Sequence, residues 1–393
     1  MHDSNLEQAF TDLVSWCRER DFAGNDPFDG LNSQLFQATP LRHSRAGRLA
    51  WTQLLKRSPI NLRPLAGVPL ERNSKGIALF ALAALADYRR RKTKEAEMEA
   101  RELLDDLFGM RLSGFSGAAW GYNFDWQGRA FFAPRGTPTA VPTAFAARAF
   151  IEAAQAFEDK EYLRIARSAC DFILNDLNQT EEAANQTCFS YSPFDRTRVF
   201  NASLLAAETL SSVSKLTGER DLCEWARRAA RYVVRYQHED GSWAYGADDY
   251  QSWVDNFHTA FVLSSLSRII HSCSSAREEF ETAARRGYDF WRKRFFLADG
   301  WPKYYADRPY PADTHSAGAA IVTLLDLQWL DSDTVQLVGK IARWTVSNLR
   351  SARGFFFYQR RRFYAVRIPF MRWSQSWMAY ALARLLEEKH SRI

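Results

Sequence analysis

The sequence predicts an all-α fold in which six helical hairpins close into a ring, an (α/α)6 toroid. One observation is a glycine-aromatic turn that recurs at Gly117, Gly241, Gly300 and Gly354, with a weaker copy at Phe189. Gly241 and Gly300 are 59 residues apart, and Gly300 and Gly354 are 54 apart. Such a period holds two helices. A single helical hairpin cannot bury its apolar face alone, so the hairpins must stack or close.

The second observation is a set of six segments that are apolar nearly all round and rich in alanine, serine and leucine. A helix of this kind is buried, and its small side chains let neighbouring helices approach closely. We therefore expect these segments to form an inner ring. They span residues 75–88, 143–156, 201–216, 257–270, 316–330 and 374–386.

The third observation is that amphipathic segments alternate with the apolar ones, as outer helices with one solvent-facing side would. Five of them span residues 94–107, 160–177, 221–236, 277–295 and 334–349. The sixth outer helix must come from the N-terminal region, either 6–20 or 48–56. An open α-solenoid is the competing arrangement, but its common repeats are shorter, about 34 to 47 residues.

No linker interrupts the alternation, so the prediction is a single toroid domain over residues 1–393. Residues 21–45 are rich in loop-forming residues and are predicted to cover one end of the ring. No strand pattern is strong enough for a large sheet. The glycine-aromatic loops are expected to form only short hairpins at one end.

Composition excludes several classes of protein. The net charge of +6 is too mild for a nucleic-acid binder. The most apolar stretch, 76–86, is too short for a membrane span, and the first residues lack the apolar core of a signal peptide. Five cysteines without C-x-x-C spacing indicate reduced thiols and a cytoplasmic location.

Polar residues just before each inner helix should converge, because the loops leading into these helices emerge at one end. The most specific pattern is formed by Asp255 and His258. Asp255 is expected to be the N-cap of the helix, and His258, three residues later, is expected to lie on the same helix face. The two could act as an acid/base pair, or the carboxylate could orient the imidazole, which would then act as the base. Alternatively, Asp255 only caps the helix and His258 satisfies a buried hydrogen bond. Asp313 and His315 stand at the corresponding point of the next repeat, which favours a shared catalytic site.

Residues 120–127 have the composition of a sugar site. Trp120 and Trp126 offer flat apolar faces, and Gln127 offers a planar amide for hydroxyl groups. Asp125 and Tyr122 are candidate catalytic groups, because an aspartate beside tryptophan can have a raised pKa. The alternative is a structural turn in which Asp125 binds backbone.

A basic and aromatic stretch follows near the C-terminus, with Arg360-Arg361-Arg362 and then Arg372. It indicates either a loop that faces an anionic ligand or a solvated loop. Arg372 is predicted to pair bidentately with a substrate carboxylate. The remaining predicted substrate-binding residues are Trp243, Trp253, Asp313, Trp373 and Gln375.

No metal and no cofactor are predicted. The sequence has no H-E-x-x-H, no clustered Cys/His set, no nucleotide-binding glycine motif and no G-x-S-x-G. A metal site built from Asp255, His258 and His315 is the remaining alternative.

The alternation and the glycine-aromatic turns resemble the six-hairpin glycosidase-like toroid superfamily. That superfamily includes glycoside hydrolases, uronyl hydrolases, polysaccharide lyases and sugar epimerases. Stretches 26–33, 254–259 and 371–377 also resemble bacterial toroid proteins encoded with surface-polysaccharide genes, some of which carry the name delta-aminolevulinic acid dehydratase. That name implies a (β/α)8 barrel, whose alternation is missing here. Squalene-type terpene cyclases are toroids too, but only Asp248-Asp249 matches their acid motif.

Residues and resemblance together predict a carbohydrate-active enzyme of polysaccharide metabolism, acting on an oligo- or polysaccharide with uronic sugars favoured. The expected chemistry is hydrolysis, β-elimination or C5 epimerisation. Elimination or epimerisation would use Arg372 on the carboxylate and His258, His315 or Tyr122 on the proton. Hydrolysis would divide acid and base roles between two carboxylates, Asp125 and Asp255. Two alternatives stay open: a non-catalytic glycan-binding or scaffold subunit with polysaccharide-assembly proteins as partners, and a terpenoid cyclase-like toroid.

Overall fold

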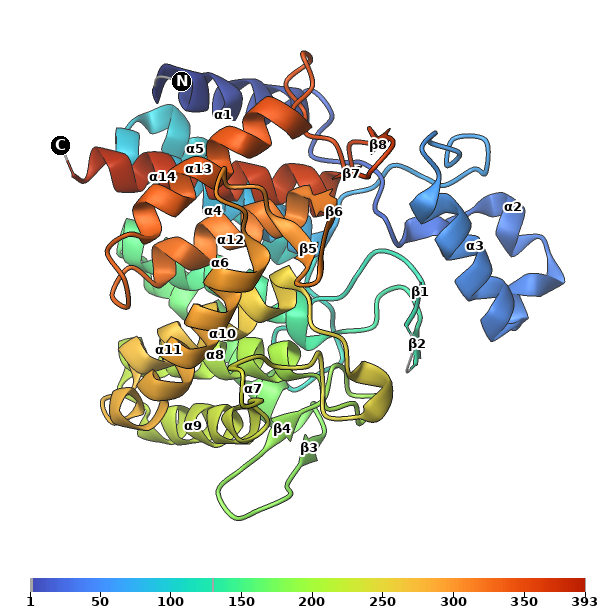
Figure 1. Ribbon diagram of the computed structural model, residues 1–393. Helices are drawn as coiled ribbons and strands as arrows, with labels where there is room; N and C mark the ends of the chain where they lie inside the picture. The colour runs from blue at the N-terminus through green and yellow to red at the C-terminus, as the bar shows by residue number, and fades with distance from the viewer. Residues whose placement is uncertain (1–2, 129–130, 393) are drawn as a thin grey trace.

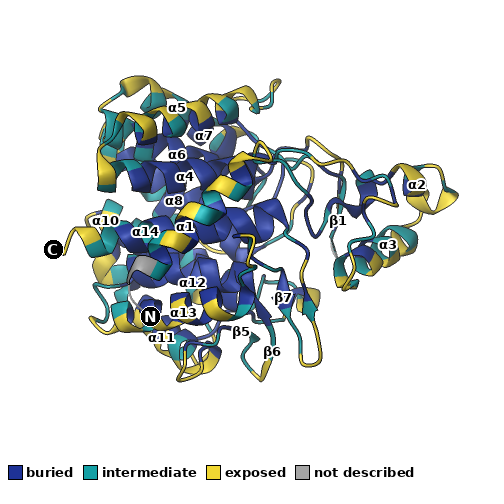
Figure 2. Ribbon diagram, turned by 90° about the horizontal axis from the view of Figure 1, so that it is seen from above, coloured by how far each residue is buried: buried dark blue, intermediate teal, exposed yellow. Residues whose placement is uncertain are grey.

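The computed structural model describes residues 3–128 and 131–392. Its inner ring consists of helices that are buried along most of their length (Figure 2). Each lies within or close to one of the predicted inner segments, because a helix apolar on every side leaves no face for solvent. The six are α4 (Ser74–Arg91), α6 (Ala140–Phe157), α8 (Phe200–Thr217), α10 (Asn256–Ser272), α12 (Thr314–Asp326) and α14 (Ser376–His390).

The outer ring consists of amphipathic helices that expose one side. Five follow the inner helices in sequence: α5 (Lys94–Gly109), α7 (Lys160–Asn175), α9 (Arg220–Arg235), α11 (Ala276–Phe295) and α13 (Thr334–Leu349). The sixth is α1 (Asp3–Arg18), which packs on α13 and α14. The other N-terminal candidate forms α3 (Arg45–Arg57), which lies outside the ring (Figure 1).

The ring is closed. Every inner helix contacts an inner neighbour on each side, and α14 packs against α4. The first and last hairpins are also joined by an ion pair between Asp12 and Arg350. The predicted (α/α)6 toroid is therefore confirmed.

Short strands lie in the loops that lead into the inner helices (Figure 1). Two isolated hairpins are β1 (Trp126–Gln127) with β2 (Phe132–Ala133), and β3 (Gln179–Thr180) with β4 (Cys188–Phe189). The last two loops join into one antiparallel four-stranded sheet of β5 (Lys303–Tyr305), β6 (Arg308–Asp313), β7 (Gln359–Arg360) and β8 (Ala365–Val366). We call this side of the ring the loop end.

The recurring glycines are required by close packing. Gly241, Gly300 and Gly354 have φ values of +91°, +93° and +94°, which side chains rarely adopt. A Cβ on Gly241 would lie 2.4 Å from the carbonyl oxygen of Arg286 in α11. Gly300 and Gly354 meet α13 and α1 in the same way. Each glycine therefore seats its turn against the outer helix of the next hairpin.

Two of the predicted sugar platforms are packing residues instead. Trp120 and Trp243 are 0% and 2% exposed. Their indole N–H groups donate to the carbonyls of Leu107 and Val233, near the ends of α5 and α9, at 2.7 and 3.0 Å. Each bond is a second one to a carbonyl near the end of its helix, since Leu107 and Val233 also accept from the backbone N–H groups of Met110 and Tyr236. Neither indole is free to contact a substrate.

The predicted covering segment, residues 21–45, lies at the loop end. It includes the short helices η1 (Asp29–Asn32), α2 (Gln34–Gln37) and η2 (Pro40–His43). Residues 30–70, which include α2 and α3, extend beyond the ring, and we call them the projecting lobe (Figures 1 and 2).

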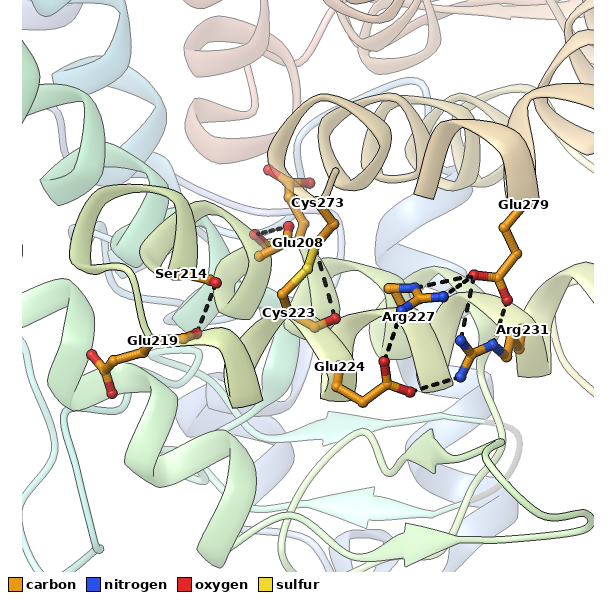
Figure 3. Close-up of a disulfide and its surroundings, with 10 residues drawn as sticks. Glu208, Ser214, Glu219, Cys223, Glu224, Arg227, Arg231, Cys273 and Glu279 are labelled. Atoms are coloured by element: carbon orange, nitrogen blue, oxygen red, sulfur yellow. Dashed lines mark hydrogen bonds and ion pairs between the residues drawn. A yellow bond between two sulfur atoms is a disulfide. The ribbon is translucent and has the colours of Figure 1, made fainter. Parts of the chain in front are cut away.

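A disulfide joins Cys223 of α9 to Cys273, which caps the end of α10 (Figure 3). Beside it, Glu279 of α11 pairs with Arg227 and Arg231 of α9. The prediction that all cysteines are reduced is wrong for this pair. Two cysteines on neighbouring helices can meet without any C-x-x-C motif, and disulfides persist mainly in oxidising compartments. The cytoplasmic prediction therefore loses its support from the cysteines.

A search of the described residues finds no helix with the length and apolar character needed to cross a bilayer. Within the same residues, no group of three or more His, Cys, Asp or Glu side chains is arranged to hold a metal ion.

Candidate active site

Asp255 and His258 form a hydrogen-bonded dyad at the start of α10. Asp255 is 1% exposed; it caps the helix through the His258 N–H at 3.0 Å and lies 2.7 Å from His258 Nδ1. Trp253 donates a further bond to the same carboxylate at 3.2 Å. The imidazole is 21% exposed, and its Nε2 has no hydrogen-bond partner among the described residues. A carboxylate on Nδ1 fixes the proton there and leaves Nε2 as an acceptor.

His315 lies nearby at the start of α12, with its imidazole packed among rings. The ring centroids of Trp373, Phe257 and Trp377 are 4.2, 4.5 and 5.0 Å away. It is 1% exposed, and neither ring nitrogen has a hydrogen-bond partner among the described residues. Burial holds its pKa well below the usual range, and the neighbouring charge of Lys75 lowers it further. His315 is therefore a neutral imidazole.

The two histidines are not at equivalent positions, contrary to the prediction. Both capping aspartates accept a bond three residues on, Asp255 from His258 and Asp313 from Ser316. His315 is only two residues after its cap. The residue equivalent to His315 is Phe257, whose ring lies 4.0 Å from His258 and 4.5 Å from His315. The structure thus brings both imidazoles into contact with one phenylalanine ring.

Lys75, in the first turn of α4, is a site residue that the sequence reasoning missed. Its side chain is buried, with the ammonium 4.5 Å from the ring of Phe145, 5.2 Å from Phe261 and 5.4 Å from Trp377. No hydrogen bond or ion pair to this ammonium is found among the described residues. Burial holds its pKa well below the ordinary value, helped by the charge of Arg372.

Arg372 lies in a π-helical turn, Met371–Gln375, just before α14. Its Nε and Nη2 bind the two oxygens of Asp26 at 2.5 and 2.8 Å, and both side chains are buried. The predicted bidentate pairing with a substrate carboxylate is therefore taken by a residue of the covering segment. The same contact anchors that segment on the loop end, beside a small hollow that both residues line.

Asp313 and Trp373 also lie next to His315. Asp313 caps the helix that holds His315, and the Trp373 ring is 4.2 Å from the imidazole. Asp313 is fully buried and accepts bonds from Gln359 at 2.8 Å and from the Trp373 indole at 3.3 Å. Burial raises the pKa of this carboxyl group. Lys56 reaches toward it from α3, and burial lowers the pKa of that ammonium to about 8. Asp313 is held by the protein and is placed to orient Trp373 and not to bind a sugar directly.

The loop of residues 120–127 brings only part of its predicted set to the site. The hydroxyl of Tyr122 lies 3.3 Å from that of Tyr191, and its ring lies beneath the Arg372 guanidinium at 5.0 Å. Burial raises the pKa of Tyr122, so the phenol stays protonated and is a poor base. The ring of Trp126 packs on Tyr191 at 5.3 Å. Asp125 accepts from the Arg135 backbone N–H at 2.8 Å, as a structural turn would.

Two predicted amides have structural roles. The Gln127 carbonyl oxygen accepts from Arg48 of α3 at 2.8 Å, and its amide donates to two backbone carbonyls of its own hairpin. Gln375 is fully buried and binds both backbone groups of Phe356, at 2.8 and 2.7 Å. Both amides are held in place by these contacts and are buried, so they serve the packing of the loops and are not presented to a substrate.

Trp253 remains a candidate platform for a sugar ring. It stacks on Tyr245 with centroids 4.4 Å apart and planes 16° apart, and both rings are partly exposed. Tyr245 in turn meets the edge of His258 at 4.6 Å. The stacked pair therefore borders the dyad directly.

Comparisons with known proteins agree with the fold. No family model and no curated protein matches this sequence. Cellobiose 2-epimerase from Bacillus thermoamylovorans B4167 is structurally similar, with a TM-score of 0.64 at 13% identity, covering 83% of this chain and 90% of the other. An unsaturated glucuronyl hydrolase specific for heparin has a TM-score of 0.64 at 14% identity, covering 99% and 98%. A D-mannose isomerase has a TM-score of 0.61 at 13% identity, covering 81% and 87%. At these identities the likeness shows the fold, the glycosidase-like (α/α)6 toroid.

Proposed function

We propose that this protein is a carbohydrate-active enzyme that transfers a proton at a sugar carbon. The observation that carries the proposal is the Asp255–His258 dyad beside His315, a buried imidazole whose two nitrogens lack partners among the described residues. A buried polar group without a partner costs stability and needs an explanation. Proton transfer to or from a substrate supplies one.

The two imidazoles suit complementary steps. The dyad leaves His258 Nε2 as an acceptor that Asp255 would stabilise once protonated. His315 is neutral and can also accept a proton. For epimerisation, one imidazole would remove the proton and become an imidazolium, and the other, having first taken up a proton from solvent, would return one to the opposite face of the carbon. Removal followed by loss of a β-substituent would give an unsaturated sugar.

Hydrolysis by two carboxylates has less support. The two oxygens of Asp255 bind the backbone N–H and the imidazole of His258 and the indole of Trp253. Asp125 accepts a hydrogen bond from the backbone N–H of Arg135. A general acid must hold a proton that it can release to the leaving group. Asp255 has no free oxygen for that role, and Asp125 is held in a turn through one of its two oxygens.

We propose a uronic sugar as the substrate, with Lys75 in place of Arg372 as the cation that meets the carboxylate. Lys75 lacks a counter-ion among the described residues, whereas Arg372 is neutralised by Asp26. A cation on the carboxylate acidifies the neighbouring C–H bond. The Trp253–Tyr245 pair would support the sugar ring. The similar structures named above, an epimerase, an isomerase and a glucuronyl hydrolase, make a sugar substrate the natural first choice.

The test is solvent exchange in D2O with a panel of neutral and uronic oligosaccharides, followed by NMR. Proton transfer predicts deuterium at one carbon of a uronic sugar, with an epimer or an unsaturated product. Cleavage without deuterium at carbon would show hydrolysis and overturn the proposal. Binding without exchange or cleavage would also overturn it and favour the glycan-binding subunit. Conversion of an isoprenoid alone would favour the cyclase.

A further inference from the structure

The projecting lobe, residues 30–70, carries the entire net charge of the chain. It contains six of the 52 basic residues and none of the 46 acidic ones, against a total net charge of +6. The nearest acidic residues in sequence are Asp29 and Glu71, at its two borders. The rest of the chain is balanced. Such a concentration of one sign predicts an electrostatic partner of the opposite sign.

The same lobe exposes large aliphatic side chains. Scattered single apolar residues are normal on a surface, but a concentration of them in one segment marks an interaction site. Six lie within this short stretch, more than half exposed in each case: Leu35 at 57%, Leu41 at 53%, Leu54 at 53%, Ile60 at 70%, Leu65 at 85% and Leu70 at 68%.

The lobe is too small to bury these side chains and is nevertheless held in place. Its own core consists of Leu55, Ala66 and Val68. Arg63 is buried and binds Asp29 at 2.6 Å, and Arg48 reaches Gln127 in the next loop. The exposed leucines are therefore presented on a fixed surface.

A second element extends this surface. The tip between β7 and β8 carries Arg361, Arg362 and Phe363, and Phe363 is 86% exposed. The Lys56 ammonium of α3 lies 5.9 Å from the Trp373 ring, and Trp373 binds the same Asp313 carboxylate as Gln359 of β7, so the base of the tip is beside the lobe. It adds two cations and one apolar ring to the same end of the molecule.

We propose that the projecting lobe docks the protein on the surface of an anionic lipid bilayer. Basic residues attract anionic headgroups, and leucine and isoleucine side chains enter the headgroup–acyl boundary without spanning the membrane. A glycan would select open aromatic faces, but the two aromatic rings of the lobe, Phe36 and Trp51, stack on each other. A second copy has no net negative charge to offer, since basic and acidic residues are equal in number outside the lobe. Docking would hold the loop end, with its candidate site, toward the bilayer.

The test is co-sedimentation with vesicles of phosphatidylcholine alone and of phosphatidylcholine mixed with phosphatidylglycerol. We expect binding to the mixed vesicles that weakens as salt is raised. The Arg42→Gln/Arg57→Gln pair should bind about thirtyfold more weakly, because each substitution removes one cation from the lipid surface. The Leu54→Ser/Leu65→Ser pair should bind about tenfold more weakly, or weaker still, because less apolar surface leaves water.

Met98→Ser and Arg343→Gln are the matched controls, because they change exposed residues on the outer helices α5 and α13. Both should bind as the parent does, and all variants should keep its melting temperature. Absence of phosphatidylglycerol-dependent binding, or equal losses in the controls, overturns the proposal. If only the Arg42→Gln/Arg57→Gln variant binds vesicles more weakly, and polygalacturonate competes with the vesicles for the parent, the proposal is overturned in favour of an anionic glycan. Vesicle binding is independent of turnover, so its failure leaves the proposed function intact.

Discussion

The two ends of the inner ring differ in how completely their buried charges are paired. At the loop end, His315 and Lys75 are buried without hydrogen-bond partners or counter-ions among the described residues. At the other end, carboxylates and guanidinium groups from the inner helices pair with one another. This network joins Arg89, Arg148, Arg268 and Arg384 to Glu152, Glu208, Asp326 and Glu387.

The pKa directions follow the pairing. Burial alone would raise the pKa of Glu152 and Asp326, but Arg89 and Arg268 hold both below the ordinary value. At the loop end, burial lowers the pKa of His315 and Lys75, and no carboxylate among the described residues reverses it. Side chains in ion pairs stay charged, and their pairing fixes how the inner helices pack against one another. Unpaired groups have pKa values shifted toward the neutral form, which suits His315 to exchange a proton with a substrate and leaves Lys75 to gain a substrate carboxylate as its counter-ion.

The largest expected effect comes from a substitution in the dyad at the loop end. His258→Gln removes the acceptor of the dyad while keeping a polar side chain, so turnover should fall about 10²- to 10⁴-fold. Initial rates of deuterium incorporation would measure the loss. His271→Gln is the matched control, because His271 lies on the same helix at its opposite end, bound to the Ser267 carbonyl. Equal rates for the parent and His258→Gln would exclude His258 from the chemistry.

The next effect breaks the paired end. Glu208→Gln removes the charge that Arg148 meets at 2.6 Å and that also accepts from Ser265 at 2.9 Å. Leaving a buried arginine without its carboxylate should cost about 3–5 kcal/mol of unfolding free energy. Denaturant unfolding would measure it. Glu224→Gln, in the partly exposed cluster of Figure 3, should cost only about 0–1 kcal/mol. Similar costs for the two variants would mean that the network is not a stabilising element.

The smallest expected effect is a change in how the stability of the protein depends on pH. An unfolded histidine binds a proton near pH 6.5, but folded His315 binds one only at lower pH. The unfolded state therefore holds more protons below 6.5, and stability should fall as pH decreases through that value. In His315→Gln, melting temperatures between pH 8 and pH 5 should fall less steeply than in the parent. The slope for His238→Gln, a loop histidine bound to Ser242, should match the parent. A parental slope in His315→Gln would show that folding does not change the pH at which His315 binds its proton.

Periodicity was enough to predict the ring, because helices apolar on all sides can only be buried. It could not choose between two amphipathic N-terminal segments, since α1 and α3 differ in what they pack against and not in pattern. The Asp255–His258 dyad followed from its capping position. Other contacts join distant residues: Arg372 and Asp26 are 346 residues apart. Lys75 looked like an ordinary helix start, and an indole looks the same in sequence whether it stacks on a sugar or caps a helix, as Trp120 does.

The seam between the first and last hairpins has a consequence for how the chain can be rearranged. Gly354 lies against α1, Arg350 pairs with Asp12, and α14 packs on α4, so this junction is built like the other junctions that carry a glycine turn. The backbone could therefore be joined across it and opened between another pair of hairpins. Such a circular permutant would keep every interhelical contact and would need its new ends only in a solvent-facing connection.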